Sequence, residues 1–282
     1  MSVQDTVLIS TINLNGIRAA YRRGFEEWIA SALPDVMLLQ EVRADHEITK
    51  NLLGDAWHVV SYPSVMKGRA GVAVAVRKNS SAVAVREGSD PVLGLEEVEE
   101  PPHSGRWVEV DLDTSTGGAL KVVSAYLHAG QKDTPKQDLK YEHLDGVTRR
   151  LNDLLDLASA GQSQALVCGD FNVVRGEADL KNWKGNHNKN AGALDQEIAY
   201  LDSWVDQGWV DVVRDLAGDR VGPYSWWSWR GKAFDNDTGW RIDYHYATQG
   251  LARAARGFDI FRADTWDARF SDHAPVTVEY LI

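Results

Sequence analysis

The sequence predicts an α/β sandwich, in which two packed β-sheets carry helices on their outer faces. Strand patterns outnumber helical patterns, and many strands follow one another directly, which favours antiparallel pairing. One long apolar stripe of helical period is typical of a helix that packs on a sheet. No low-complexity linker and no long repeat divides the chain, so we expect residues 1–282 to form a single domain.

Alternating or continuous apolar runs mark the strands. In Gly71–Arg77 every second residue is a valine, which places the valines on one face. Arg106–Leu112 and Leu120–Tyr126 form an expected hairpin across the turn residues Thr114–Gly118. The other expected strands are Val7–Asn13, Val36–Gln40, Trp57–Ser61, Ala82–Arg86, Ala165–Cys168, Tyr224–Trp229, Arg241–Ala247, Gly257–Phe261 and Pro275–Leu281.

Helical spacing of apolar residues marks a second set of segments. The longest is Asp138–Ala158, whose leucines and valines repeat every three or four residues. Phe25–Leu33, which a proline ends, His46–Leu53 and Leu194–Trp204 are shorter expected helices. Between them the Gly- and Asn-rich segment Lys181–Gly192 is predicted to be a loop, long enough to suggest a function.

The charge is unevenly distributed along the chain. A net charge of −11 argues against a polyanionic partner. Much of the acidic excess is local, because segment 87–100 holds six acidic residues and no lysine or arginine. By contrast, Lys181–Asn190 holds three lysines and no acid, and Arg18, Arg22 and Arg23 form a second basic cluster. Such runs are usually solvated faces, so net charge alone does not decide the class of partner.

Cysteine content and hydropathy bear on the location of the protein. The single cysteine, Cys168, excludes an intrachain disulfide and suits a reducing cytoplasm. The first residues lack the basic and apolar regions of a signal peptide, and no apolar run has the length of about eighteen residues that a membrane span requires. We therefore expect a cytoplasmic protein with no membrane partner.

The polar residues that carry chemistry are centred on Ala165–Val174. The run Ala165–Cys168 reads as a buried strand that ends at Gly169. If the backbone stays extended beyond it, Asp170 and Asn172 leave the same face, at a strand end where α/β proteins build their sites. The plainer alternative is a turn, since Gly, Asp and Asn are common turn residues.

Four further stretches place polar side chains at the ends of expected strands or inside them, and each alone could be only a turn, a cap or a solvent-facing position. They are Asn13 with Asn15, Gln40 with Glu41, Asp243, and Asp272 with His273. Oxygen donors with one imidazole suit Mg²⁺ or Mn²⁺ rather than Zn²⁺. The chain has no Gly-x-Ser-x-Gly elbow and no Gly-x-x-x-x-Gly-Lys loop. The remaining chemistry is metal-assisted attack by water, with a carboxylate as proton acceptor and an Asp-held histidine that contacts phosphate as a cation.

Five motifs occur in order from near one end of the chain to the other. They are Asn13–Ala19 (Asn-Leu-Asn-Gly-Ile-Arg-Ala), Leu39–Glu41 (Leu-Gln-Glu), Gly169–Asn172 (Gly-Asp-Phe-Asn), Gly239–Tyr244 (Gly-Trp-Arg-Ile-Asp-Tyr) and Ser271–Val276 (Ser-Asp-His-Ala-Pro-Val). This set resembles the exonuclease III / apurinic–apyrimidinic (AP) endonuclease family of the endonuclease–exonuclease–phosphatase superfamily. The resemblance implies a four-layer, DNase I-like α/β sandwich and a Mg²⁺-dependent DNA repair nuclease, with Mn²⁺ as a possible substitute. Such an enzyme would cut 5′ to abasic sites, act as a 3′–5′ exonuclease and clean 3′ ends, as a monomer on double-stranded DNA in a bacterial cytoplasm, at the nucleoid.

The resemblance also implies a role for each matching residue. The implied metal ligands are Glu41, as the main one, with Asn13, Asp170, Asn172 and Asp272. The implied catalytic residues are Asp170, which orients or deprotonates the water, Asn172, which stabilises the transition-state phosphate, His273 paired with Asp243, and Tyr126 at the phosphate or the leaving group. The implied substrate-binding residues are Asn15, Trp226, Trp240 and Ile242, of which the last three would line a pocket for a base-free sugar.

The chain departs from the family pattern after Tyr126. The family usually has Pro and then Gln or Asn before Gly, whereas this chain has His128 and Ala129. The resemblance therefore implies that a substrate contact is lost or is transferred to His128. Asn15 stands where some members carry Asp, which would weaken a second metal site.

Three other functions remain open at this point. The net charge favours another phosphoesterase of the superfamily, acting on RNA, an inositol phosphate or a phospholipid, whereas Trp226, Trp240 and the basic segment Lys181–Lys189 favour a nucleic acid. A catalytically dead binding module should have lost at least one motif residue, and none is missing. Eight histidines invite a zinc hydrolase, but none of them shows His-Glu-x-x-His spacing.

Overall fold

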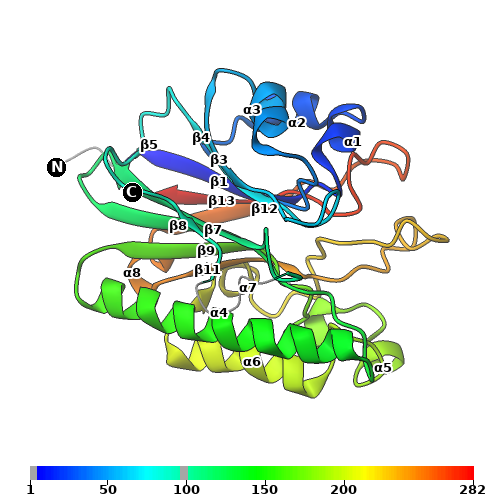
Figure 1. The fold of residues 1–282 in the computed structure, drawn as a ribbon. Helices are drawn as coiled ribbons and strands as arrows, with labels where there is room; N and C mark the ends of the chain where they lie inside the picture. The colour runs from blue at the N-terminus through cyan, green and yellow to red at the C-terminus, as the bar shows by residue number, and fades with distance from the viewer. Residues whose placement is uncertain (1–4, 96–100) are drawn as a thin grey trace.

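The computed structural model describes residues 5–95 and 101–282, so part of the acidic segment 87–100 lies outside the described residues. Two β-sheets pack face to face, with helices outside each of them (Figure 1). This arrangement confirms the predicted four-layer α/β sandwich. Among the described residues no helix is both long and apolar enough to cross a membrane.

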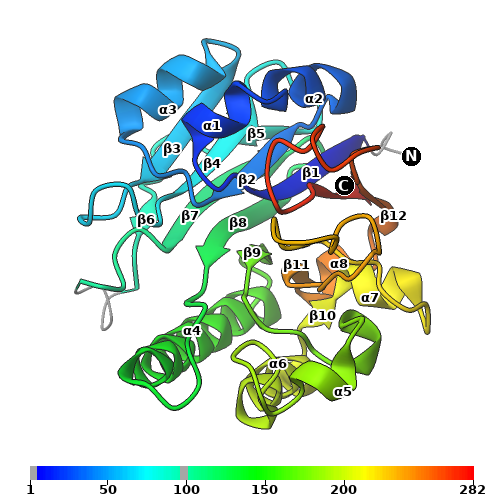
Figure 2. The same ribbon diagram turned by 90° about the vertical axis from the view of Figure 1, so that its right-hand side faces the viewer.

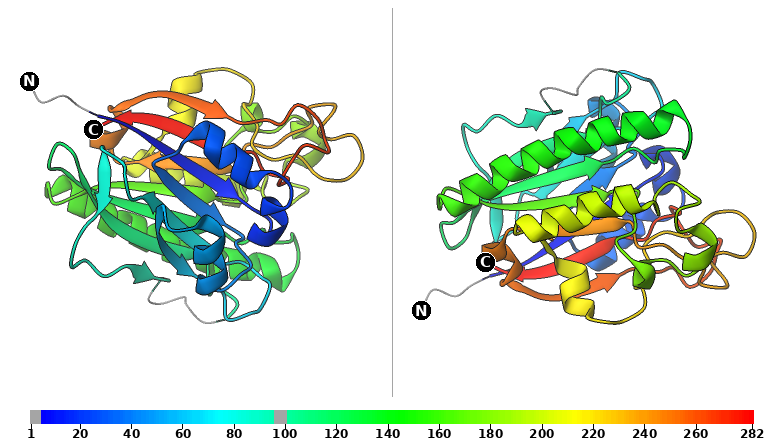
Figure 3. Two further views of the ribbon diagram at one scale, coloured as in Figure 1. Left: turned by 90° about the horizontal axis from the view of Figure 1, so that it is seen from above. Right: turned by 90° about the horizontal axis from the view of Figure 1, so that it is seen from below.

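The first sheet has six strands in the order β12-β13-β1-β2-β4-β3, and only β1 and β2 pair in parallel. The helices α1, α2 and α3 lie over its outer face, as the view from above shows (Figure 3, left). The elements are β1 (Thr6–Asn13), α1 (Ile17–Tyr21), α2 (Phe25–Ala32), β2 (Val36–Gln40), α3 (His46–Leu53), β3 (Trp57–Tyr62), β4 (Val72–Arg77), β12 (Ala255–Ile260) and β13 (Val276–Leu281).

The second sheet has the order β10-β11-β9-β8-β7-β5, and β6 pairs with β7. Here β8 and β9 form the parallel pair. The helices α4 and α6 cover its outer face (Figure 3, right). The elements are β5 (Val83–Val85), β6 (Val92–Leu93), β7 (Trp107–Thr114), β8 (Ala119–Tyr126), α4 (Pro135–Ser159), β9 (Gln164–Asp170), η1 (Glu177–Asp179), α5 (Trp183–Asn186), α6 (Asp195–Gln207), β10 (Val210–Asp211), α7 (Val212–Ala217), β11 (Asp243–Ala247) and α8 (Gln249–Ala252).

The core follows from the period of two along each strand. On β8, Val122 faces the first sheet in the inner core, while the next residue, Val123, faces α4 in the outer core. The apolar stripe of α4, which includes Leu144 and Leu151, packs against that outer face. Each such buried side chain stabilises the fold by about 1.5–3 kcal/mol relative to exposure.

The two parallel pairs bring the polar motifs together. Asn13 pairs with Gln40 at the carboxyl ends of β1 and β2, and Tyr126 pairs with Asp170 at the carboxyl ends of β8 and β9. The antiparallel strand β11 enters the same edge, because its first residue, Asp243, lies opposite Asp170. Loops gather at this edge, on the right of Figure 1 and facing the viewer in Figure 2.

Two predicted elements are wrong. Tyr224–Trp229 is no strand; within it Trp226 forms only isolated bridges, to Trp240 and to His273. Its aromatic residues have high strand propensity, but the backbone partners are loop segments, so no ladder extends. The predicted loop Lys181–Gly192 contains the short helix α5. The short helices α1, α7 and α8 were not predicted, since they are too short for a clear apolar period.

Candidate active site

The strand β9 delivers Asp170 to the edge. Gly169 has φ 150°, and a Cβ there would collide with the carbonyl oxygen of Ala125 on β8, so only glycine allows this approach. The backbone does not stay extended beyond Asp170, because Asn172 has φ 53°. The chain bends here, as in the plainer alternative of a turn, and the bend joins the two side chains. The Asn172 backbone N–H donates to Asp170 Oδ1 at 2.9 Å, and the Asn172 Nδ2 donates to Oδ2 at 3.2 Å.

Three of the motif residues have left-handed backbone conformations. Asn15, Glu41 and Asn172 have φ of 47°, 45° and 53°, and each follows within two residues of the end of a strand. Such conformations are costly for residues other than glycine and concentrate at functional sites. The sharp reversal lets each side chain turn back toward the strand end that it has just left.

Asn13 lies at the centre of the network. It is fully buried, and its Nδ2 donates to Glu41 Oε1 at 3.0 Å and to Asp170 Oδ2 at 2.9 Å. The Arg43 guanidinium also pairs with Glu41. One amide thus joins the carboxylates of the two sheets, which fixes their separation.

Asp272 joins the same network through Asn15. The Asn15 Nδ2 donates to Asp272 Oδ1 at 2.8 Å, and the Asn15 backbone N–H donates to Asn13 Oδ1 at 3.0 Å. The indole of Trp226 donates to Asp272 Oδ2 at 3.1 Å. Asn15 therefore contacts a predicted metal ligand directly in this structure.

His273 lies between two buried carboxylates. Its Nδ1 is 2.9 Å from Asp243 Oδ2, and its Nε2 is 3.7 Å from Asp170 Oδ2. Ser225, which the sequence analysis missed, donates its hydroxyl to Asp243 Oδ2 at 2.6 Å and accepts the Asp243 backbone N–H at 3.1 Å. The predicted pair of His273 and Asp243 is present.

These contacts set the protonation states. Burial by itself lowers the pKa of His273, but Asp243 and then Asp170 raise that pKa to about 10, so the imidazole is a cation at neutral pH. Burial raises the pKa of Asp170, the His273 cation opposes that shift, and the result is a pKa of about 7. A carboxyl group with that pKa is suited to exchange a proton near neutral pH.

Tyr126 ends β8 opposite Asp170. Burial, with the nearby charges of Glu41 and Asp170, raises its pKa well above the usual value, so it remains a neutral phenol that can donate a hydrogen bond. The guanidinium of Arg106 lies over its ring, 4.7 Å from the centroid. Arg106 carries no motif signal and was missed.

The donor set fits a divalent cation. Asp170, Asp243 and His273 have ligand atoms within 4.8 Å of one another and can hold a metal ion. Both nitrogens of His273 face carboxylates, however, so an ion pair already accounts for that closeness. Glu41 and Asp272 with the Asn13 amide supply oxygen donors without a thiolate, which suits a hard ion such as Mg²⁺ or Mn²⁺.

The three predicted pocket residues lie together. The rings of Trp226 and Trp240 are perpendicular, with centroids 6.0 Å apart, and Ile242 is buried beside them. The intervening Arg241 is fully buried and paired with Asp179 and Asp211, at 2.7 and 2.8 Å. This clamp fixes the backbone between the two predicted wall residues.

His128 does not lie in the network of carboxylates. Its Nε2 is 3.0 Å from His103 Nδ1, and the ring of His143 on α4 lies 5.1 Å from its own. We call His103, His128 and His143 the histidine cluster.

Lys140 on α4 fixes the backbone on both sides of the site. It is fully buried and pairs with Glu197, and it donates hydrogen bonds to the carbonyl oxygens of Ala129 and Asn172.

A family model described as the Endonuclease/Exonuclease/phosphatase family matches residues 10–273. The chain belongs to this family. Within it, an exodeoxyribonuclease of Bacillus subtilis is 30% identical over 266 residues, which cover 94% of this chain and 95% of the relative. Exodeoxyribonuclease III of Haemophilus influenzae is 27% identical, over 96% of this chain and 98% of the relative.

Solved structures of the family share the fold. An AP endonuclease from Archaeoglobus fulgidus superposes with a TM-score of 0.79 at 24% identity, over 98% of this chain and 100% of that one. The 3′–5′ exonuclease of Neisseria meningitidis superposes with a TM-score of 0.80 at 24% identity, over 97% and 99% of the two chains. This likeness shows that the chain has the same sandwich fold.

Proposed function

We propose that this chain is a Mg²⁺-dependent DNA repair nuclease that cleaves the phosphodiester bond 5′ to abasic sites and removes nucleotides or blocking groups from 3′ ends. The observation that carries the proposal is the line Asp243–His273–Asp170, joined through Asn13 to Glu41. In this proposal His273 is the cation, Asp170 is the proton acceptor, and Glu41 with Asn13 supplies oxygen donors for a metal ion. The full-length similarity to exodeoxyribonucleases supports DNA as the substrate.

Each side chain has a task that its surroundings support. Asp170 accepts a proton from the attacking water, since its carboxylate is held in place by Asn13 and Asn172. The His273 cation and the Asn172 amide stabilise the negative phosphate, and Tyr126 donates a hydrogen bond to the phosphate or leaving oxygen.

Glu41 and Asp272, with Asn13, would hold the divalent cation. When bound, it supplies positive charge next to the phosphate oxygens and the leaving group. Asn15 orients Asp272 for that task through the 2.8 Å hydrogen bond. We infer that Mn²⁺ substitutes for Mg²⁺ because both ions accept the same oxygen donors.

Trp226, Trp240 and Ile242 would form the wall of a pocket for the abasic sugar. In this proposal the apolar wall accepts a bare deoxyribose and excludes a nucleotide that still carries its base. Trp240→Ala should therefore reduce abasic-site cleavage about tenfold or more, from loss of fit, and affect 3′-exonuclease action less. Rates on two labelled substrates, an internal abasic analogue and an intact recessed 3′ end, measure the ratio. Equal losses on both would refute the pocket.

A labelled duplex with one abasic-site analogue tests the main proposal. We expect one cut 5′ to the lesion with Mg²⁺, the same cut with Mn²⁺ and none with EDTA. A ladder of products from the 3′ end alone would support the proposed exonuclease activity and refute the proposed endonuclease activity. If no DNA is cleaved, the second candidate function is favoured, a phosphoesterase that acts on another phosphoester. The net charge of −11 supports that candidate, and RNA and inositol phosphates would then be tested as substrates. We also propose that the protein is monomeric and that it is cytoplasmic, and its single cysteine supports the second of these.

A further inference from the structure

A groove beside the catalytic residues is lined by arginines and tryptophans. It has a volume of about 720 Å³, and Arg22, Arg23, Trp229, Trp266 and Arg269 are among its lining residues. They come from the end of α1, from the loop before β11 and from the loop between β12 and β13, which lie beside one another in Figure 2. We call this feature the arginine–tryptophan groove. A groove of this volume is large enough for a nucleoside.

The groove adjoins the site described above through Asn15. That residue also lines the groove, and its Nδ2 donates to Asp272 at 2.8 Å. A ligand in the groove would therefore lie one side chain away from a predicted metal ligand. This proximity connects the groove to the reacting phosphate.

The two tryptophans form an aromatic surface. Their rings meet edge to face, with centroids 5.4 Å apart and an angle of 82° between the planes. The guanidinium groups of Arg23 and Arg269 lie over the Trp229 ring at 5.2 and 4.1 Å. Arg269 also lies 5.6 Å from the centre of the Trp266 ring, and Trp266 remains 41% exposed. An exposed indole held by a neighbouring ring offers a rigid face for stacking.

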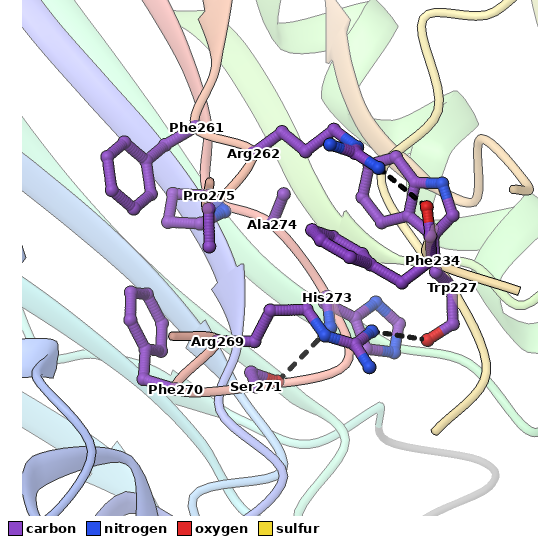
Figure 4. A pocket seen from close by; sticks show the side chains of 11 residues that line it. Trp227, Phe234, Phe261, Arg262, Arg269, Phe270, Ser271, His273, Ala274 and Pro275 are labelled. Carbon is purple, nitrogen blue, oxygen red and sulfur yellow. Dashed lines mark hydrogen bonds between the residues drawn. The ribbon is translucent and has the colours of Figure 1, made fainter. Parts of the chain in front are cut away.

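The charge of the groove is opposite to that of the whole chain. Its lining holds three arginines and one acid, Asp267, in a protein of net charge −11. Arg22 and Arg23 are exposed, while Arg269 is only 5% exposed and donates Nη1 to the carbonyl oxygen of Trp227 at 2.9 Å (Figure 4). Its buried Nη2 makes no hydrogen bond within the part of the chain that the structure describes. The positive charge of the exposed Arg22 and Arg23 favours an anionic ligand.

We propose that the arginine–tryptophan groove binds an unpaired nucleotide of the DNA substrate, with the base stacked on Trp266 and the phosphates against Arg22 and Arg23. A base inside a duplex has both faces covered by its neighbours, whereas an unpaired base has a face free to stack on the indole. The inference rests on the proposed function, because it takes the nucleotide to belong to the strand being cleaved. It predicts tighter binding of DNA that is gapped or frayed beside the reacting phosphate.

Binding without catalysis is the direct test. The probe is a labelled short oligothymidylate in EDTA, measured by fluorescence anisotropy. Trp266→Ala should weaken binding about fivefold or more, and Trp266→Phe should stay within about twofold of the wild type because a ring remains. Phe261→Ala is the matched control, since Phe261 is also 41% exposed and lies outside the groove lining. Unchanged binding by Trp266→Ala, or equal weakening by the control, would overturn the proposal.

The salt dependence tests the two surface arginines separately. Arg22→Gln and Arg23→Gln should each reduce the slope of log affinity against log salt by about one if each contacts a phosphate. An unchanged slope in both variants would refute the proposed contacts between phosphates and these two arginines.

A cleavage assay separates this inference from the proposed function. Trp266→Ala should raise KM for an abasic analogue beside a short gap, with little change in kcat, and should leave cleavage in a continuous duplex unchanged. An unchanged KM for the gapped substrate in Trp266→Ala, or the same rise in KM on both substrates, would contradict the groove. If the wild-type enzyme cuts neither substrate, the proposed function fails, and the oligothymidylate measurement still decides whether the groove binds unpaired nucleotides.

Discussion

Two of the buried regions that contain histidine differ in the charge of the imidazole. His273 lies between Asp243 and Asp170, and these carboxylates raise its pKa to about 10. In the histidine cluster burial lowers the pKa of all members, and among the described residues the Glu142 carboxylate, 3.7 Å from His103, opposes that shift for His103. Burial is nearly the same in both regions. The comparison shows that the neighbouring charges, not the residue type, decide which histidine is a cation.

The largest expected effect concerns the carboxylate that both holds His273 charged and accepts the proton. Asp170→Asn should lower kcat by about 10³-fold or more, because the proton acceptor is lost while the shape is kept. Single-turnover cleavage of the abasic duplex measures kcat, and anisotropy measures DNA binding, which should be unchanged. A rate near that of the wild type would contradict the assigned role.

Removing the other carboxylate should make His273 resemble the histidine cluster. With Asp243 present, the imidazole stays a cation as the pH rises until about 10. Asp243→Asn should lower the pKa of His273 and reduce kcat about 10²-fold, with a further loss of activity as the pH rises through the range where histidine normally titrates. His273→Gln is the matched control, since it should show no such step. An identical pH profile for Asp243→Asn and the wild type would show that the charge of His273 does not contribute to kcat.

The histidine cluster should affect acid stability and little else. Its folded pKa values lie below the unfolded value of about 6.5, so the unfolded chain binds more protons as the pH falls below that value. The free energy of unfolding therefore falls as the pH is lowered below about 6.5. His143→Leu should reduce this loss by about 1 kcal/mol for each pH unit below 6.5, as measured by urea unfolding. Its cleavage rate at pH 8 should equal that of the wild type. An unaltered pH dependence of stability would show that His143 accepts a proton in the folded state.

The sequence motifs located most of the site. Asp170, Asn172, Asp243, Asp272 and His273 were found because each lies within an apolar strand or close to its end or its start, and the structure brings all of them to one edge. The position of Glu41 was found in the same way, directly after the fully buried strand β2. Their roles stay predictions that the variants above test.

Other participants carry no local signal. Ser225 lies in an aromatic segment with no motif that marks it, although its hydroxyl donates a hydrogen bond to Asp243 and so orients that carboxylate. Lys140 belongs to an amphipathic helix and would be expected in solvent, yet it is fully buried against Glu197 and fixes the backbone at Asn172. Only the path of the chain shows what such residues contact.

The sequence by itself determined where strands and helices form and which faces are apolar. That information is local, because the period of two or of 3.6 residues decides which side chains point to one face. It gave β2 and α3 at their observed bounds, and it gave the strand ends where the polar motifs lie. Only the tertiary structure determined that the residues of the histidine cluster and of the arginine–tryptophan groove lie together, because they are far apart in the chain. Packing two sheets and closing their loops brings such residues together, and no periodicity along the chain records those contacts.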